Sequence, residues 1–118
     1  MLHRPDPNRI LVTSDGTRIS EVLGRVATGD ASCSVARIVM PVGRGQPRRH
    51  NDFRELMIII SGSCEVDLPA GTVQLAPGDV LDLPPGTPYA ERGGPDGCTL
   101  WAVCWPAFQP DLVTWLEA

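Results

Sequence analysis

Lysine is absent from this sequence, and its ten basic residues other than histidine are all arginine. Since a Schiff base with a carbonyl substrate or with pyridoxal phosphate requires a lysine amine, this class of covalent catalysis is excluded. Histidine is nearly as scarce, with His3 in a proline-rich N-terminal stretch and His50 further along the chain. A metal site built on two histidines is therefore not expected. We predict that residues 1–8 form a flexible tail.

Long hydrophobic runs are missing too. No apolar stretch approaches the roughly 18 residues that a membrane helix needs. The start of the chain lacks the hydrophobic region of a secretory signal, so we expect a cytoplasmic protein without a membrane partner. The net charge is −4, and the one dense basic run, 44–49, is too short to follow a phosphate backbone. We therefore expect no nucleic acid partner.

The four cysteines lack the C-x-x-C spacing of zinc sites and redox motifs. Without a secretory signal a disulfide framework is not expected either, so we predict reduced thiols. Cys64 alternates with Val66 and Leu68 against acidic neighbours, a pattern typical of a buried residue in a strand. A nucleophilic cysteine is the less favoured alternative.

Helices have little room in this chain, because 12 glycines and 12 prolines interrupt it at short intervals. Many short strands separated by glycine and proline turns indicate a β-sandwich or a β-barrel. The expected strands are 9–13, 18–26, 32–40, 46–50, 54–60, 63–68, 72–76, 79–83, 88–92 and 97–105.

Two of these strands are apolar on both faces. In 55–60 the odd-numbered side chains, which include Met57, must face one way and the even-numbered ones the other. One face can line a barrel interior, whereas the other needs a cover, so we predict a homodimer. The stretch 99–105 has the same character, and its row with Trp101 and Trp105 forms either dimer contacts or cavity wall.

Two spaced motifs carry the strongest signal in the sequence. The first follows the pattern H-x-H-x4-E-x6-G after a proline and is met by Pro47, Arg48, His50, Glu55 and Gly62. The second follows the pattern G-x5-P-x-G-x2-H and is met by Gly78, Pro84, Gly86 and, in the histidine position, Tyr89. Together these motifs resemble those of the cupin superfamily. The resemblance implies an all-β double-stranded β-helix, the jelly-roll barrel, as a single domain over residues 1–118.

In metal-binding cupins the histidines and the glutamate of these motifs point inward and bind one divalent ion. Residues at i and i+2 share a strand face, so the resemblance implies that Arg48 and His50 share the cavity with Glu55 and Tyr89. Arg49 is then expected to face solvent. A guanidinium has no lone pair to offer a metal, so Arg48 supplies positive charge instead of a ligand.

The leading hypothesis is an enzyme of small-molecule metabolism, an isomerase, cyclase or lyase without an essential metal or other cofactor. His50 suits proton transfer near neutral pH, and Arg48 suits an anionic or carbonyl group of the substrate. An alternative interpretation leaves Arg48 on the surface. The remaining candidates are catalytic Glu55 and Tyr89 and substrate-binding Met57 and Trp101.

Two other functions stay open. One divalent metal ion bound by His50, Glu55 and Tyr89 would make the protein a metal-dependent lyase or cyclase. A non-catalytic module would bind or sense a ligand in a mostly apolar cavity. Each hypothesis makes a small molecule the partner, and Arg48 favours an anionic one.

Overall fold

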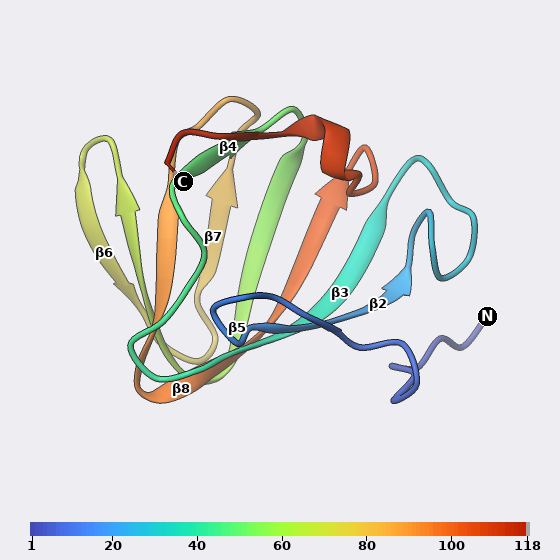
Figure 1. Ribbon diagram of the computed structural model, residues 1–118, viewed down its shortest axis with the longest axis horizontal. Helices are drawn as coiled ribbons and strands as arrows, with labels where there is room; N and C mark the ends of the chain where they lie inside the picture. Colours follow the sequence, from blue (N-terminus) through green and yellow to red (C-terminus); the bar gives the residue numbers. More distant parts are fainter. Residues whose placement is uncertain (118) are drawn as a thin grey trace.

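The computed structural model describes residues 1–117 as an all-β fold with one short 3-10 turn (Figure 1). The elements are β1 (Leu11–Val12), β2 (Arg18–Leu23), β3 (Ser34–Met40), β4 (Arg49–Asn51), β5 (Arg54–Leu68), β6 (Gly71–Leu75), β7 (Val80–Leu83), β8 (Ala90–Trp105), η1 (Pro110–Leu112) and β9 (Val113–Trp115). The expected all-β class is confirmed. Within residues 1–117 no helix has the length and hydrophobicity to cross a membrane.

One antiparallel sheet makes up most of the barrel. Its strand order is β1-β2-β3-β8-β5-β6, and β7 also pairs with β5. The long strand β8 is central, since it pairs with β3 on one side and with β5 on the other. β4 and β9 form a separate two-stranded sheet. In Figure 1 the C-terminal segment therefore crosses the barrel beside β4, which comes from the middle of the chain.

β5 and β8 are each one long strand where two shorter strands were expected. The expected breaks, at Gly62 and at 93–97, are positions where the strands bend and their pairing register shifts. Gly62 has a φ of 73°, and a Cβ at this position would lie 2.1 Å from the carbonyl oxygen of Gly97. The glycine taken for a turn thus permits a close approach of two bent strands.

Strand β9 was not predicted, and the strand expected at 46–50 is β4. The pairing of β4 with β9 continues beyond both of its ends. The Asp52 N–H donates to the Leu112 carbonyl (2.8 Å), and the Leu116 N–H donates to the Arg48 carbonyl (2.9 Å). A strand of three residues has no periodic signal of its own, so β9 forms because β4 offers it a partner.

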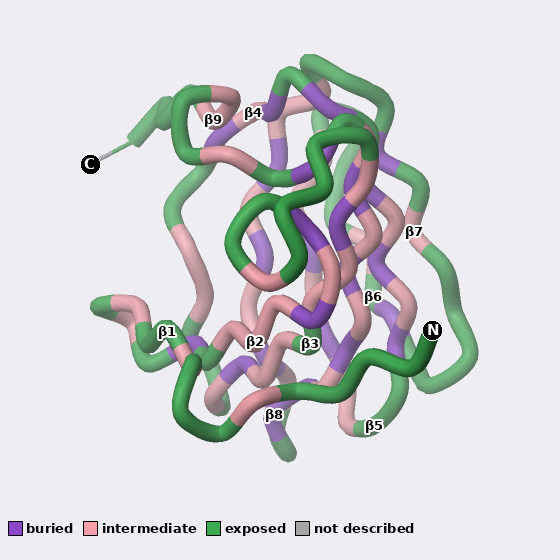
Figure 2. Tube along the Cα trace, turned by 90° about the vertical axis from the view of Figure 1, so that its right-hand side faces the viewer, coloured by how far each residue is buried: buried purple, intermediate pink, exposed green. Residues whose placement is uncertain are grey.

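The barrel interior is packed by one face of each long strand, as the buried segments in Figure 2 indicate. On β5, Glu55, Met57 and Ile59 are buried, whereas the residues between them are half-buried or exposed. The expected alternation of this strand is therefore confirmed. Its inward residues pack against those of β8, including the fully buried Leu100.

Trp101 lies on the outer face of the barrel, so its expected contact with substrate is wrong. The buried residues of this part of β8 are Leu100, Ala102 and Cys104. Trp101 is half-buried on the other face, where it pairs with Ile58. Alternation brings the small even-numbered side chains of β8 to the cavity and leaves the tryptophans outside.

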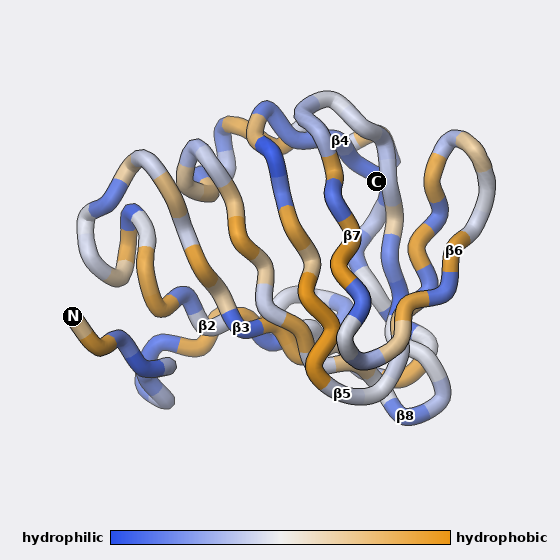
Figure 3. The backbone as a smooth tube through the Cα atoms, turned by 180° about the vertical axis from the view of Figure 1, so that it is seen from behind, coloured by the Kyte–Doolittle hydropathy of each residue, from blue (hydrophilic) through white to orange (hydrophobic). Residues whose placement is uncertain are grey.

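The outer face of β5 and β8 forms an apolar patch. The register sets Ile58 beside Trp101 and Leu56 beside Val103, and Figure 3 shows the hydrophobic run of β5 from this side. At the edge of the patch the Arg54 guanidinium carbon lies 5.0 Å from the centre of a tryptophan ring. The predicted homodimer would cover this patch and stays a prediction.

Ile58→Glu should convert such a dimer into a monomer, because the new carboxylate would be buried without a partner against the second copy. The molar mass from light scattering after size-exclusion chromatography measures this change. Val12→Glu, at an exposed position on the edge strand β1, should leave the mass unchanged. A wild-type protein that is monomeric at high concentration would contradict the homodimer.

Gly62 and Gly43 allow the close approach of β5 and β8 to be tested. Both have a positive φ, 73° and 66°, but no atom would lie within 4 Å of a Cβ at Gly43. Gly43→Ala should therefore destabilise the protein only through its backbone conformation, by about 1–2 kcal/mol. Gly62→Ala should cost at least about 2 kcal/mol more, because the backbone must shift. Urea unfolding gives both values, and equal losses would contradict the close approach.

Candidate functional site

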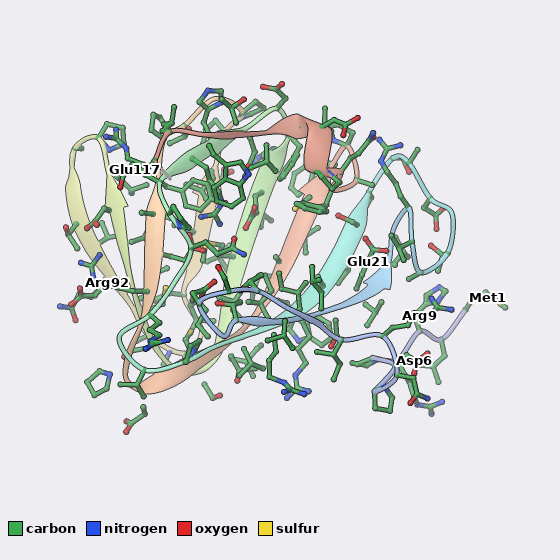
Figure 4. The ribbon with its side chains drawn as sticks, viewed as in Figure 1. Met1, Asp6, Arg9, Glu21, Arg92 and Glu117 are labelled. Carbon is green, nitrogen blue, oxygen red and sulfur yellow. The ribbon has the colours of Figure 1, made fainter. Side chains whose placement is uncertain are left out.

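A cavity of about 260 Å³ lies inside the barrel. Residues of β1 to β5 and β8 line it, together with the C-terminal segment, and Figure 4 shows side chains from these elements filling the interior. Its apolar wall includes Ile19, Ala36, Ile38, Phe53, Ala102 and Phe108. Ligand cavities in proteins usually measure roughly 300–1,000 Å³, so this one, just below that range, has room only for a small molecule.

Five polar residues gather at this cavity and directly behind it, and we call them the polar cluster. They are Arg49 and Asn51 from β4, Glu55 from β5, Tyr89 just before β8, and Glu91 on β8. All five are at least nine-tenths buried. So many polar groups inside an apolar barrel are costly unless they are paired, and most of them contact one another.

Arg48 and His50 do not point into the cavity, so their predicted place in the site is wrong. Arg48 is exposed, as the alternative interpretation had it, and His50 is half-buried on the outer side of β4. Arg49, expected in solvent, is 7% exposed and lines the cavity with Asn51. The alternation was predicted correctly, but its phase was wrong by one residue.

The phase follows from unbroken alternation between β4 and β5. Arg49, Asn51, Phe53 and Glu55 are all buried, and the residues between them are not. His50 and Glu55 are five positions apart, so unbroken alternation puts them on opposite faces. One extra residue between them, as in a β-bulge, would be needed to bring both to the same face. Counting back from Glu55 in steps of two would have found the three inward residues before it.

Glu55 and Tyr89 meet inside the barrel, as expected. The Tyr89 hydroxyl donates to Glu55 Oε1 at 3.4 Å. Asn51 Nδ2 donates to the Tyr89 hydroxyl oxygen at 3.0 Å and to Glu55 Oε1 at 3.4 Å. The three side chains thus form one network at the cavity surface.

Arg49 is held by an ion pair that sequence reasoning missed. Its Nη2 lies 2.9 Å from Glu91 Oε1, and its Nη1 donates to the Pro47 carbonyl at 3.2 Å. The guanidinium carbon also lies 4.4 Å from the centre of the Tyr89 ring and 5.5 Å from that of Trp115. Glu91 follows Tyr89 by two residues, so strand alternation was the signal that could have found it.

The charges of this cluster shift the pKa of Glu55. The pKa of Glu55 is raised from 4.5 to about 7, mainly by burial and also by the charge of Glu91, against the attraction of Arg49. Burial, with the nearby Glu55, also keeps the pKa of Tyr89 well above 10, so its phenol stays protonated. Although burial alone lowers the pKa of Arg49, Glu91 raises it above its ordinary value. Glu55 is thus a group whose charge changes near neutral pH.

Met57, a predicted substrate-binding residue, lines a second and smaller cavity. This space measures about 30 Å³ and lies behind the first, sharing Arg49 and Glu55 with it. Met57 is 3% exposed and belongs to the hydrophobic core. Met57 is not among the residues that line the larger cavity.

The metal set considered from the sequence is not assembled. His50 lies outside the cavity that holds Glu55 and Tyr89, and its Nδ1 is buried without a hydrogen-bond partner among residues 1–117. In the same part of the chain no three His, Cys, Asp or Glu side chains gather closely enough to hold a metal ion. These residues therefore do not fit the proposed ion.

The cysteines are all free thiols. Cys64 is buried, as expected, and Cys98 and Cys104 are buried as well. Cys104 lines the cavity near Glu55, and burial raises the pKa of its thiol above the ordinary value. It is therefore a poor nucleophile.

Solved structures of known proteins share this fold. Streptomyces Pac13, described as a nucleoside dehydratase, matches with a TM-score of 0.79 at 18% identity, over 99% of this chain and 92% of that one. A Pac13 variant with uridine gives a TM-score of 0.80. Oxalate decarboxylase from Bacillus subtilis matches with a TM-score of 0.79 at 16% identity, over 89% of this chain and 29% of that one. These identities show the fold alone, and the cupin jelly roll is confirmed.

The sequence matches one curated protein and one family model. Endoribonuclease YbeY of Myxococcus xanthus is 32% identical over 105 residues, which are 88% of this chain and 36% of that protein. The chain thus spans about a third of that relative, whose activity is not carried over. Residues 36–117 match the model described as the AraC-like ligand binding domain. Because this match covers most of the chain, the protein belongs to the AraC-like ligand binding domain family of cupin-type proteins.

Proposed function

We propose that this cupin binds a small organic molecule in its cavity and that Glu55 transfers a proton to or from that molecule. The observation that carries the proposal is a buried carboxyl group on the wall of a ligand-sized cavity, with a pKa of about 7. A group with this pKa has substantial populations of both its acid and its base at neutral pH, which general acid–base catalysis requires. Strongly shifted pKa values are typical of functional sites.

The neighbours of Glu55 have complementary roles in this proposal. Tyr89 and Asn51 both donate to Oε1, so we assign proton exchange with the bound molecule to Oε2. Arg49 lies close enough to favour the carboxylate form, which limits the effect of burial. Removal of a proton from the molecule by Glu55 and its return at another atom would be an isomerisation, or a cyclisation where the deprotonated oxygen adds within the molecule. Removal of a proton from carbon with its transfer to a neighbouring hydroxyl, which then leaves as water, would be an elimination.

Glu55 thus takes the acid–base role first assigned to His50, and Arg49 takes the place in the barrel first assigned to Arg48. Arg49 differs from the expected anchor, because its charge is already paired with Glu91. The nucleoside dehydratase with this fold supports proton-transfer chemistry in such a barrel.

A sensing function is the second candidate, and the family match to an AraC-like ligand binding domain favours it. A sensor would bind its ligand and release it unchanged. Glu55→Gln separates the two functions once a ligand is known. In an enzyme this variant would bind the ligand without converting it, whereas in a sensor the wild-type protein would also leave it unconverted.

The shifted pKa of Glu55 should be visible in the stability of the protein. The pKa of Glu55 is about 7 in the folded protein, above the ordinary value of 4.5, so the folded state binds this proton more tightly than the unfolded state. The stabilisation that results is present at low pH and is lost as the pH rises through about 7. The free energy of unfolding of the wild type should fall relative to Glu55→Gln by about 3 kcal/mol between pH 4.5 and 8. Urea unfolding at several pH values measures it. Glu117→Gln is the exposed control, and a parallel pH dependence of wild type and Glu55→Gln would contradict the shift.

Two neighbouring arginines test the orientation of β4. Arg49 lowers the pKa of Glu55 and Glu91 raises it, so Arg49→Met should move this pKa above about 7 and Glu91→Gln should move it down. The carboxyl ¹³C signal of Glu55 in NMR titrations reports both shifts. Arg48→Met, on the exposed side, should leave the titration unchanged. A shift with Arg48→Met but none with Arg49→Met would mean that the inward arginine has been misplaced.

A further inference from the structure

We infer that the ligand of this cavity is an uncharged or cationic molecule that donates hydrogen bonds to Asn51 Oδ1 and the neighbouring carboxylates, and that anions are excluded. This inference rests on the proposed function, because it names the chemical class that the same cavity takes. It replaces the expectation of an anionic ligand, which depended on Arg48 facing the cavity. Three properties of the cavity support it.

The first property is the charge around the cavity. Among the residues of 1–117 that line the two cavities, Arg49 is the sole cation, whereas Glu21, Glu55 and Glu91 are carboxyl groups. Glu91 already neutralises Arg49 at 2.9 Å. Glu21, labelled in Figure 4, comes from β2 and adds to the acidic side. An anion would therefore meet no unpaired positive charge, and in a buried site repulsion from a carboxylate is weakly screened.

The second property is a set of buried acceptors without donors. Asn51 is 5% exposed, and its Nδ2 donates to both Tyr89 and Glu55. These two bonds orient the amide and leave Oδ1 buried with no partner among the described residues. Glu91 Oε2 also lacks a partner in this part of the chain, but Glu91 lines only the smaller cavity behind. An unsatisfied buried acceptor costs about 1–3 kcal/mol, and a ligand with N–H or O–H groups would recover this loss.

The third property is the aromatic wall of the cavity. Phe53 and Phe108 pack edge to face with ring centres 6.0 Å apart, and Trp115 lies on the same cavity. Aromatic walls in a space of about 260 Å³ suit a flat, apolar ring. A ring that carries an amide or an amidine combines this body with the donors that Asn51 and the carboxylates lack.

Benzamide, benzamidine and benzoate test the inference directly, because they share size and shape and differ in charge and donors. The purified wild-type protein is titrated with each at pH 8, and binding is followed by the indole N–H signal of Trp115 in NMR. Trp101 and Trp105 lie on the outer face and serve as internal references. Benzamide and benzamidine should shift the Trp115 signal, and benzoate should bind at least about tenfold more weakly than benzamide.

Asn51→Leu tests the proposed acceptor, since leucine keeps the size of the side chain and removes its carbonyl. It should weaken benzamide binding about tenfold, whereas Arg48→Met, next to β4 on the exposed side, should not change it. The comparison of the three compounds in the wild type needs no variant, so it holds even where Asn51→Leu does not fold.

Benzoate binding as tightly as benzamide, or no binding by any of the three up to their solubility limits, would overturn the inference. The proposed function fails by a different result, an ordinary pKa for Glu55. A carboxyl that titrates near pH 7 together with preferred benzoate binding would thus remove the ligand class and leave the acid–base role. Preferred benzamide binding with an ordinary pKa for Glu55 would support the ligand class and remove the acid–base role.

Discussion

Arg49 and Glu91 form a buried ion pair with 2.9 Å between nitrogen and oxygen, and much of the cavity is arranged around it. Removing one partner of such a pair typically costs about 3–5 kcal/mol, because the other charge is left buried and unpaired. The pair joins β4 to β8. Since the Arg49 guanidinium also lies against the Tyr89 and Trp115 rings, it ties the C-terminal segment to the barrel as well.

The ion pair also sets the electrostatic surroundings of Glu55. This carboxyl lies between a cation and an anion, so burial decides the direction in which its pKa moves. A nearly neutral environment with fixed hydrogen bonds from Tyr89 and Asn51 suits a group that exchanges protons near pH 7. The same environment offers acceptors and no free cation to a ligand. Chemistry and ligand class thus follow from one cluster of side chains.

Bent strands make this arrangement possible. β5 and β8 curve around the cavity because glycines at their bulges allow the backbones to approach each other, as at Gly62 and Gly97. Their inward faces then bring Glu55 and the small residue Ala102 to the larger cavity, and Glu55 and Glu91 to the smaller cavity behind it. Large side chains such as Trp101 are left on the outer face, where they contribute an apolar patch.

The sequence by itself determined the all-β class, the cupin resemblance and the inward position of Glu55 and Tyr89, because glycine spacing, motif spacing and strand alternation are local patterns. Only the tertiary structure decided the phase of β4. The motif placed His50 inside, whereas unbroken alternation into β5 places Arg49 and Asn51 there. The motif and the alternation thus allowed different phases, and what decides between them is the pairing of the buried Arg49 with Glu91 from a distant strand, which neither local pattern contains.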